Sequence, residues 1–156
     1  MMRRWIVSGA LTLAAVAACG GGIRPSYAPL PEAMVDTLSA APPAAVAQLA
    51  TTMVAEGLRV QWRSDNEGYL ESQWFDLVTR QNGSFDRAAP ERYVRFRFFV
   101  DPLGTDRSVV HAEVVVLRTV DPSVMERDAE MMAPPGNGGR QILTRVLQES
   151  ARGLGG

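Results

Sequence analysis

The sequence of 156 residues contains no lysine, one cysteine and one histidine. With a single cysteine, the chain cannot form an internal disulfide. These counts leave no cysteine–histidine spacing of the kind that zinc sites use, and the acidic segment 121–130 lacks the glycine and ligand positions of a calcium loop. A Ser-His-Asp arrangement would depend on His111 alone, and no serine is marked as its partner. We therefore expect no metal, no cofactor and no catalytic residue.

The chain also has no apolar run of the roughly 20 residues that a membrane-spanning helix needs. Arg3 and Arg4 precede an uncharged, mostly apolar segment over residues 5–18, and three glycines at 20–22 follow it. A basic start and a short apolar run are typical of a secretory signal peptide. The sequence predicts a signal peptide over residues 1–18.

The end of this apolar segment, Val16-Ala17-Ala18-Cys19, resembles the lipobox of bacterial lipoproteins. The resemblance implies that Cys19 receives a diacylglycerol, that the chain is cut before it, and that the new amine is acylated. Two or three acyl chains give a stable membrane anchor. Because Gly20 rather than aspartate follows the cysteine, the resemblance also implies an address at the outer membrane, facing the periplasm. The alternative is an ordinary secreted protein with a free or intermolecularly paired cysteine.

An excess of positive charge is missing from the rest of the chain. After residue 18 there remain 14 arginines and 17 acidic side chains. Nucleic-acid binding needs a basic footprint, and anionic lipid headgroups attract polybasic clusters. The composition therefore argues against both nucleic acid and a headgroup-binding patch, and the expected contact with the membrane is the covalent lipid.

The sequence therefore predicts three segments. Residues 1–18 form the signal peptide, residues 19–41 are a lipidated cysteine with a flexible tether rich in glycine and proline, and residues 42–156 are a single domain. The domain should open with a helix, because Val46, Leu49 and Met53 recur at helical spacing between Pro42-Pro43 and Gly57. A last helix is expected over 139–152.

Between these helices the hydrophobic period changes to two, which predicts β-strands. We expect four strands, over residues 58–63, 69–79, 92–100 and 107–120. Two helices packed on one face of a four-stranded antiparallel meander would cover every apolar stripe. The predicted fold class is therefore α+β, with the order α-β-β-β-β-α.

The other face of this sheet is predicted to carry solvated polar side chains with cross-strand charge pairs. Arginine and aromatic side chains dominate the energetics of many protein interfaces, so this face is a candidate docking surface. The candidate interaction residues are Glu71, Gln73, Tyr93, Arg95, Arg97, Phe99, His111 and Glu113.

The segment Gly68-Tyr69-Leu70-Glu71-Ser72-Gln73-Trp74 is similar to a strand of the BamC-type outer-membrane assembly lipoproteins. The helix that ends at Gly57, the acidic turn before Gly68 and the closing helix fit the same arrangement, over residues 43–153. The resemblance implies a helix-grip-like fold and a non-catalytic scaffolding role in the envelope. BamC itself is longer, with two such domains and an extended N-terminal segment.

We expect a scaffold or accessory subunit of envelope assembly, with the barrel-assembly machinery as a candidate partner. One alternative is a lipid-anchored carrier, which would need a cavity between the helices and the sheet face that carries Val94, Phe96, Val114 and Val116. The other alternative is a hydrolase that uses His111.

Overall fold

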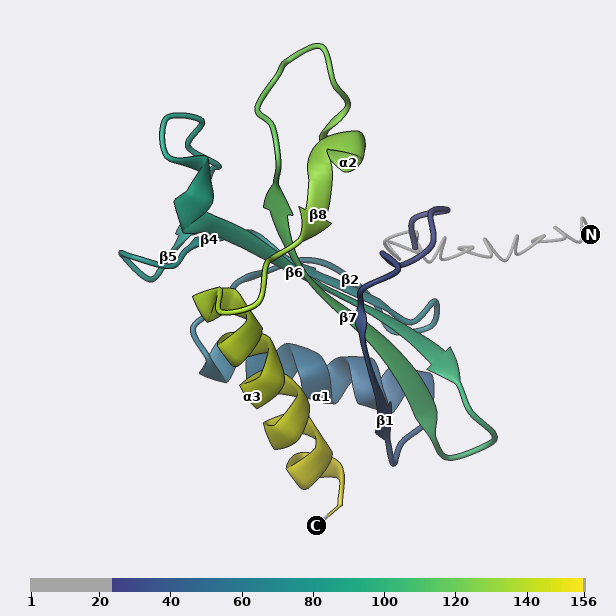
Figure 1. The fold of residues 1–156 in the computed structure, drawn as a ribbon. Helices are drawn as coiled ribbons and strands as arrows, with labels where there is room; N and C mark the ends of the chain where they lie inside the picture. The colour runs from purple at the N-terminus through teal and green to yellow at the C-terminus, as the bar shows by residue number, and fades with distance from the viewer. Residues whose placement is uncertain (1–23, 156) are drawn as a thin grey trace, which may run out of the picture.

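The computed structural model describes residues 24–155, so the predicted signal peptide and Cys19 lie outside the described residues. Within that range the chain forms an eight-stranded antiparallel sheet and three helices. Helices α1 (Pro42–Ala55) and α3 (Gly138–Leu154) lie on the same side of the sheet (Figure 1). The short helix α2 (Glu126–Ala129) lies apart from them, beyond one end of the sheet.

The two long strands β6 and β7 form the centre of the sheet, and they pair from Arg95↔Val115 to Pro102↔Ser108. The path across the sheet is β1-β7-β6-β3-β2, while β4 extends the pairing of β6, β5 pairs with β4, and β8 pairs with the far end of β7. The strands are β1 (Met34–Leu38), β2 (Val60–Ser64), β3 (Tyr69–Ser72), β4 (Trp74–Asp76), β5 (Gln81–Gly83), β6 (Tyr93–Pro102), β7 (Ser108–Leu117) and β8 (Glu130–Met132).

The prediction of a four-stranded meander with two helices is therefore wrong, although the four expected strands are neighbours in the order β2-β3-β6-β7. One addition lies in the segment expected to be a tether. Residues 34–38 form β1, which pairs with β7 from Met34↔Ala112 to Leu38↔Ser108 and buries Leu38 completely. An extended chain gains this ladder because β7 would otherwise leave its backbone groups unpaired at the sheet edge.

The other unexpected strands arise where an expected strand or loop is interrupted, and hydrophobic periodicity does not reveal these interruptions. The expected strand 69–79 breaks at Gln73, whose backbone N–H donates to the Arg59 carbonyl at 2.8 Å. Arg80 then adopts a left-handed conformation with φ of 56° and turns the chain into β5. Further on, the sequence predicts a loop or a short irregular helix after Pro122, and this segment contains the short helix α2 and the unexpected strand β8.

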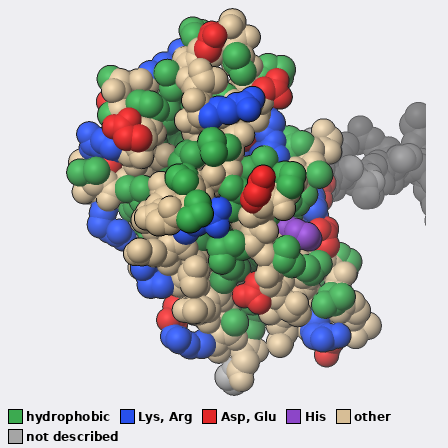
Figure 2. Space-filling model, viewed as in Figure 1, with side chains coloured by type: hydrophobic (Ala, Val, Ile, Leu, Met, Phe, Trp, Pro, Cys, Tyr) green, Lys and Arg blue, Asp and Glu red, His purple; other side chains and the backbone are tan. Residues whose placement is uncertain are grey.

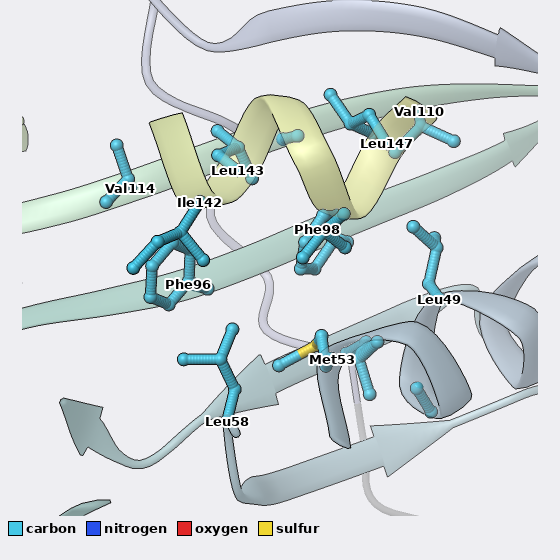
Figure 3. Close-up of a cluster of buried hydrophobic side chains, with 14 of the residues drawn as sticks. Leu49, Met53, Leu58, Phe96, Phe98, Val110, Val114, Ile142, Leu143 and Leu147 are labelled. Atoms are coloured by element: carbon cyan, nitrogen blue, oxygen red, sulfur yellow. The ribbon is translucent and has the colours of Figure 1, made fainter. Parts of the chain in front are cut away.

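The hydrophobic core lies between the sheet and the two long helices, as Figure 3 shows. Leu49 and Met53 of α1, with Leu143 of α3, contribute fully buried side chains. Phe96 and Phe98 face them from β6. The predicted helix after Pro42 and the predicted inward face of β6 are thus confirmed.

Candidate interaction surface

The sheet face opposite the helices carries the predicted polar residues, but much of it is covered. Residues 24–30, which we call the N-terminal strap, make contacts with this face. The segment that contains α2 and β8 contributes further side chains to it. The prediction that the face is solvated is wrong for Glu71, Arg97, Phe99 and Glu113, which are buried. Periodicity indicates which residues share a face and gives no sign of what covers it.

Seven ionisable side chains of this face and of the segment with α2 and β8 meet here, and of these Glu126 is exposed. The charge network, as we call it, consists of Glu71, Arg95, Arg97, Glu113, Glu126, Arg127 and Glu130. Four carboxyl groups thus face three guanidinium groups. Buried charges are tolerated only when they are paired and hydrogen-bonded, so the pairing within the network decides its stability.

Arg97, on β6, is the best-satisfied member of the network. Its Nε donates to Glu71 at 2.6 Å, and its two terminal nitrogens donate to the two oxygens of Glu130 at 2.6 and 2.5 Å. Burial alone would lower the pKa of Arg97, but the hydrogen bonds and charge of Glu130, and then Glu71, outweigh burial and raise it. Arg97 therefore stays charged, and it joins β3, β6 and β8.

Tyr69 gives Glu71 a second hydrogen-bond donor. Its hydroxyl donates to Glu71 at 2.5 Å within the buried region. Burial raises the pKa of Tyr69, and the neighbouring Glu71 charge raises it further. The phenol therefore remains a hydrogen-bond donor rather than an acid–base group.

Glu113, on β7, is the least satisfied member of the network. Its Oε1 accepts a hydrogen bond from the Leu30 backbone at 2.5 Å, while its buried Oε2 has no hydrogen-bond partner among the described residues. Arg97 and Arg127 lie 3.7 Å from Oε2, too far for hydrogen bonds. Burial raises the pKa of Glu113, and these arginines only partly oppose it.

The N-terminal strap closes over the network through Tyr27. The Tyr27 ring lies 4.0 Å from the guanidinium carbon of Arg127 and 5.6 Å from that of Arg97. Arg127 also donates to the Ala28 carbonyl at 3.0 Å. At the start of the strap, Arg24 forms a two-pronged ion pair with Asp101, at 2.6 and 3.1 Å. The strap is thus fixed at both ends by charge-assisted contacts.

Arg95 lies at the border between the network and an open groove. It is stacked on Trp74, with 4.3 Å between the guanidinium carbon and the ring centroid, and it donates to Glu126 at 2.7 Å. Its Nε is 3.8 Å from Glu71, and this buried donor has no hydrogen-bond partner among the described residues.

The open groove has a volume of about 530 Å³ and lies beside the first residues of β2. Gln73, one of the predicted residues, lines it together with Arg95. No acidic side chain is among its lining residues, which are Arg59, Gln61, Gln73, Trp74, Asn82, Gly83, Ser84 and Arg95.

The other predicted residues do not join the network. The ring of Phe99 packs against Tyr27 and Tyr69. Half-buried Tyr93 packs against Phe85. Half-buried His111 lines a shallow depression with Asp101, Pro29, Leu30, Pro31, Ala33 and Val35. The sequence therefore predicted the correct strands, but Phe99, Tyr93 and His111 lie in three separate places on them.

The missed members of the network are Glu126, Arg127 and Glu130, together with Tyr27 of the strap. Glu126, Arg127 and Glu130 lie in a segment without hydrophobic alternation, where acidic and basic side chains usually indicate a solvated loop. The pairing of β8 with β7, from Val115↔Met132 to Leu117↔Glu130, carries them over the sheet. No signal within a single sequence predicts that pairing.

Within residues 24–155, no group of three or more His, Cys, Asp or Glu side chains is placed to hold a metal ion. None of the helices in this part of the chain is long and apolar enough to cross a membrane. In comparisons with known proteins, no protein-family model and no curated protein matches the chain.

Proposed function

We propose that this protein is a bacterial lipoprotein, anchored in the outer membrane by acyl chains on Cys19 and facing the periplasm. Its domain would act as a non-catalytic scaffold or accessory subunit that binds another envelope component, with the barrel-assembly machinery as the first candidate. The basic start, apolar run and lipobox-like Val16-Ala17-Ala18-Cys19 support the anchor.

The observation that carries the proposal is the attachment of the strap to the domain directly after the proposed lipidation site. Arg24 lies only five residues after Cys19, and it is bound to Asp101 and Glu67. Five residues span at most about 18 Å. A domain held this close to its anchor is suited to contact membrane-bound partners, whereas a long tether would let it range freely.

The charge network supports a structural role for its members. Its arginines are engaged by carboxylates, so they hold the strap, β6 and β8 together. Figure 2 shows basic and acidic side chains interspersed over the face in view, without an extended area of one charge. Such a surface fits specific protein contacts better than non-specific attraction to a polyanion.

The carrier alternative gains no support from the packing between sheet and helices. Val94, Phe96 and Val114 are fully buried. At the start of α3, a methyl group added to Gly139 would lie 2.7 Å from Val114 and 3.1 Å from Val94. The helix therefore lies directly against the sheet face where a ligand would have to enter.

The hydrolase alternative also gains no support. The depression beside His111 is lined by Asp101 and by apolar residues of the strap region and β1, and contains no serine. A histidine base without a nucleophile in reach lacks the geometry of nucleophilic catalysis.

The proposal is tested by tagging the C-terminus, crosslinking briefly in cells, extracting in mild detergent and identifying co-purified proteins by mass spectrometry. We expect membrane flotation that depends on Cys19 and recovery of barrel-assembly subunits. Cys19→Ser is the matched control, because it should keep the fold and release the protein from the membrane. Recovery of this protein alone would reject a stable assembly partner.

A further inference from the structure

The end of the N-terminal strap closes over the least satisfied carboxyl group of the charge network. The Leu30 N–H donates to Glu113 Oε1 at 2.5 Å, and the Glu113 side chain is fully buried. Glu113 Oε2 has no hydrogen-bond partner among the described residues. Glu71 and Glu130, by contrast, both accept hydrogen bonds from Arg97. The strap therefore excludes water from a carboxyl group whose ionised form lacks full pairing.

The groups around Glu113 do not supply the missing pairing. Its charged or titratable neighbours are Arg97 of β6, Arg127 of α2, Glu130 of β8, Glu71 of β3, Tyr27 of the strap and His111 of β7. Glu130 is bound by both of these arginines, so neither is fully available to Glu113. The strap adds no positive charge here, because its only charged residue, Arg24, is paired with Asp101. Burial consequently raises the pKa of Glu113, against the Leu30 hydrogen bond and the two arginines.

The strap can open while the sheet stays intact. Residues 24–30 belong to no strand, and the first strand begins only at Met34. Opening breaks the Leu30 hydrogen bond and lets water reach Glu113, and it leaves the ladder between β1 and β7 in place. An ionised carboxyl gains much more from this hydration than a protonated one. Opening of the strap therefore depends on the protonation of Glu113.

The closed strap is favoured at low pH. Burial in the closed state raises the pKa of Glu113, and water in the open state returns it towards its ordinary value. The closed state therefore binds the proton more tightly, and this contribution to its stability is fully present below the ordinary pKa. The contribution is lost as the pH rises through the raised pKa.

We propose that the N-terminal strap is a pH-sensitive lid, which is closed over protonated Glu113 and opens more often when Glu113 is ionised. The lid rests on contacts within residues 24–155 and depends neither on lipidation nor on an envelope partner. Its opening uncovers Phe99 and Arg97, which contact Tyr27 in the closed state. Aromatic and arginine side chains are enriched in protein interfaces, so the open lid would present a surface suited to a protein partner.

Hydrogen exchange of the full-length chain in mild detergent, resolved by residue with NMR, tests the lid. The quantity compared is the protection factor, which corrects for the direct effect of pH on the exchange rate. We expect the protection factor of the Leu30 amide to fall at least about threefold from acidic to neutral pH. The Val100 amide, which donates to the Gly68 carbonyl in the sheet, should show no such fall. A Leu30 protection factor that does not change with pH would overturn the proposal.

Two variants identify the group that titrates. Glu113→Gln should abolish the fall at Leu30, because glutamine still accepts the hydrogen bond and cannot ionise. His111→Gln is the matched control, since it removes the half-buried titratable side chain two residues earlier in β7 and should leave the fall unchanged. A fall that persists in Glu113→Gln, or one that disappears with His111→Gln, would overturn the assignment to Glu113.

The carbon chemical shift of the Glu113 carboxyl gives a second measurement on the unchanged protein, which applies even if Glu113→Gln does not fold. The protection factor of Leu30 should level off above the pH at which this carboxyl titrates. Protection that continues to fall after the carboxyl is fully ionised would assign the opening to another group and overturn the proposal.

Discussion

At the scale of single residues, Glu113 shows how the charge network is balanced. Four carboxyl groups face three guanidinium groups, so one carboxyl lacks a full partner, and it is Glu113 whose Oε2 is buried without a hydrogen bond. The charged groups that face it are Arg97, Arg127 and Glu130, and the Leu30 N–H donates to its other oxygen. Burial outweighs the arginines and raises the pKa of Glu113.

The raised pKa predicts the effect of Glu113→Gln on stability. A carboxyl whose pKa is higher in the folded state binds its proton more tightly there, so its ionisation favours unfolding as the pH rises. Glutamine keeps an acceptor for Leu30 and cannot ionise. We expect the variant to exceed the unchanged protein in unfolding free energy by about 1 kcal/mol at neutral pH, because the incompletely paired buried charge is removed. The gain should shrink towards acidic pH.

Urea unfolding of the two proteins between acidic and neutral pH measures this difference. Glu149→Gln makes the same change on the exposed side of α3 and should alter the unfolding free energy by less than about 0.5 kcal/mol. A gain for Glu113→Gln that does not depend on pH would contradict the raised pKa. Lower stability at neutral pH would show that the charges of Arg97 and Arg127 outweigh burial.

At the scale of elements, the N-terminal strap has one aromatic ring, Tyr27, at the centre of its contacts with the domain. Tyr27 stacks on Arg127 and packs edge-on against Phe99, with 6.1 Å between the two ring centroids. The strap, residues 24–30, belongs to no strand, so its position relies on side-chain contacts: those of Tyr27, the bonds of Arg24 to Asp101 and Glu67, and the hydrogen bonds of Ala28 and Leu30 to the network. Such a segment should open without unfolding of the sheet.

Tyr27→Ala should therefore loosen the strap alone. Loss of the stacking on Arg127 and of the contact with Phe99 is worth roughly 1–2 kcal/mol, which corresponds to about a tenfold increase in opening. Hydrogen exchange measures this at the Leu30 amide, whose bond to Glu113 breaks when the strap opens. Exchange within β6 should not change. Tyr27→Phe keeps the ring and should exchange like the unchanged protein. Equal exchange at Leu30 in Tyr27→Ala and Tyr27→Phe would show that the ring does not hold the strap in place.

The elements also show what the sequence could predict. Helices α1 and α3 and strands β6 and β7 are long enough for their period to be visible, and their inward faces were predicted correctly for Val94, Phe96 and Val114. Strands β1, β5 and β8 have three to five residues each. Their existence depends on the free backbone groups of the strands they join, and those become apparent only when the sheet is assembled.

The same reason explains why the candidate site was only partly predicted. The alternation of β6 and β7 placed Arg95, Arg97 and Glu113 on one face, which is correct. The cover over that face comes from the strap and β8, which lie far away in the chain and have no periodic pattern. The sequence therefore predicted that the face with Arg97 and Glu113 is exposed, whereas the strap and β8 bury much of it.

At the scale of the whole molecule, the strap determines how the domain would sit on its membrane anchor. Arg24 is bound to Glu67, in the turn between β2 and β3, and to Asp101. Arg24 is the fifth residue after Cys19, and five residues of chain reach at most about 18 Å. Helices α1 and α3 cover the face of the sheet opposite to the one that the strap contacts. The β2–β3 turn should therefore be close to the bilayer and the end of α3 farther away.

This orientation can be measured by energy transfer to acceptor-labelled lipid headgroups. In the proposed lipoprotein the acyl chains would occupy Cys19, the only native cysteine. A cysteine introduced at Asn66, in the β2–β3 turn, or at Arg152, near the end of α3, would then carry the donor dye alone. In vesicles that hold the lipidated protein, we expect more efficient transfer from position 66 than from position 152. Adding Tyr27→Ala should reduce the difference, because an open strap lengthens the connection to the anchor. Equal transfer from both positions with Tyr27 unchanged would contradict this orientation. It would mean that the strap detaches from the sheet at the membrane and acts as a flexible tether.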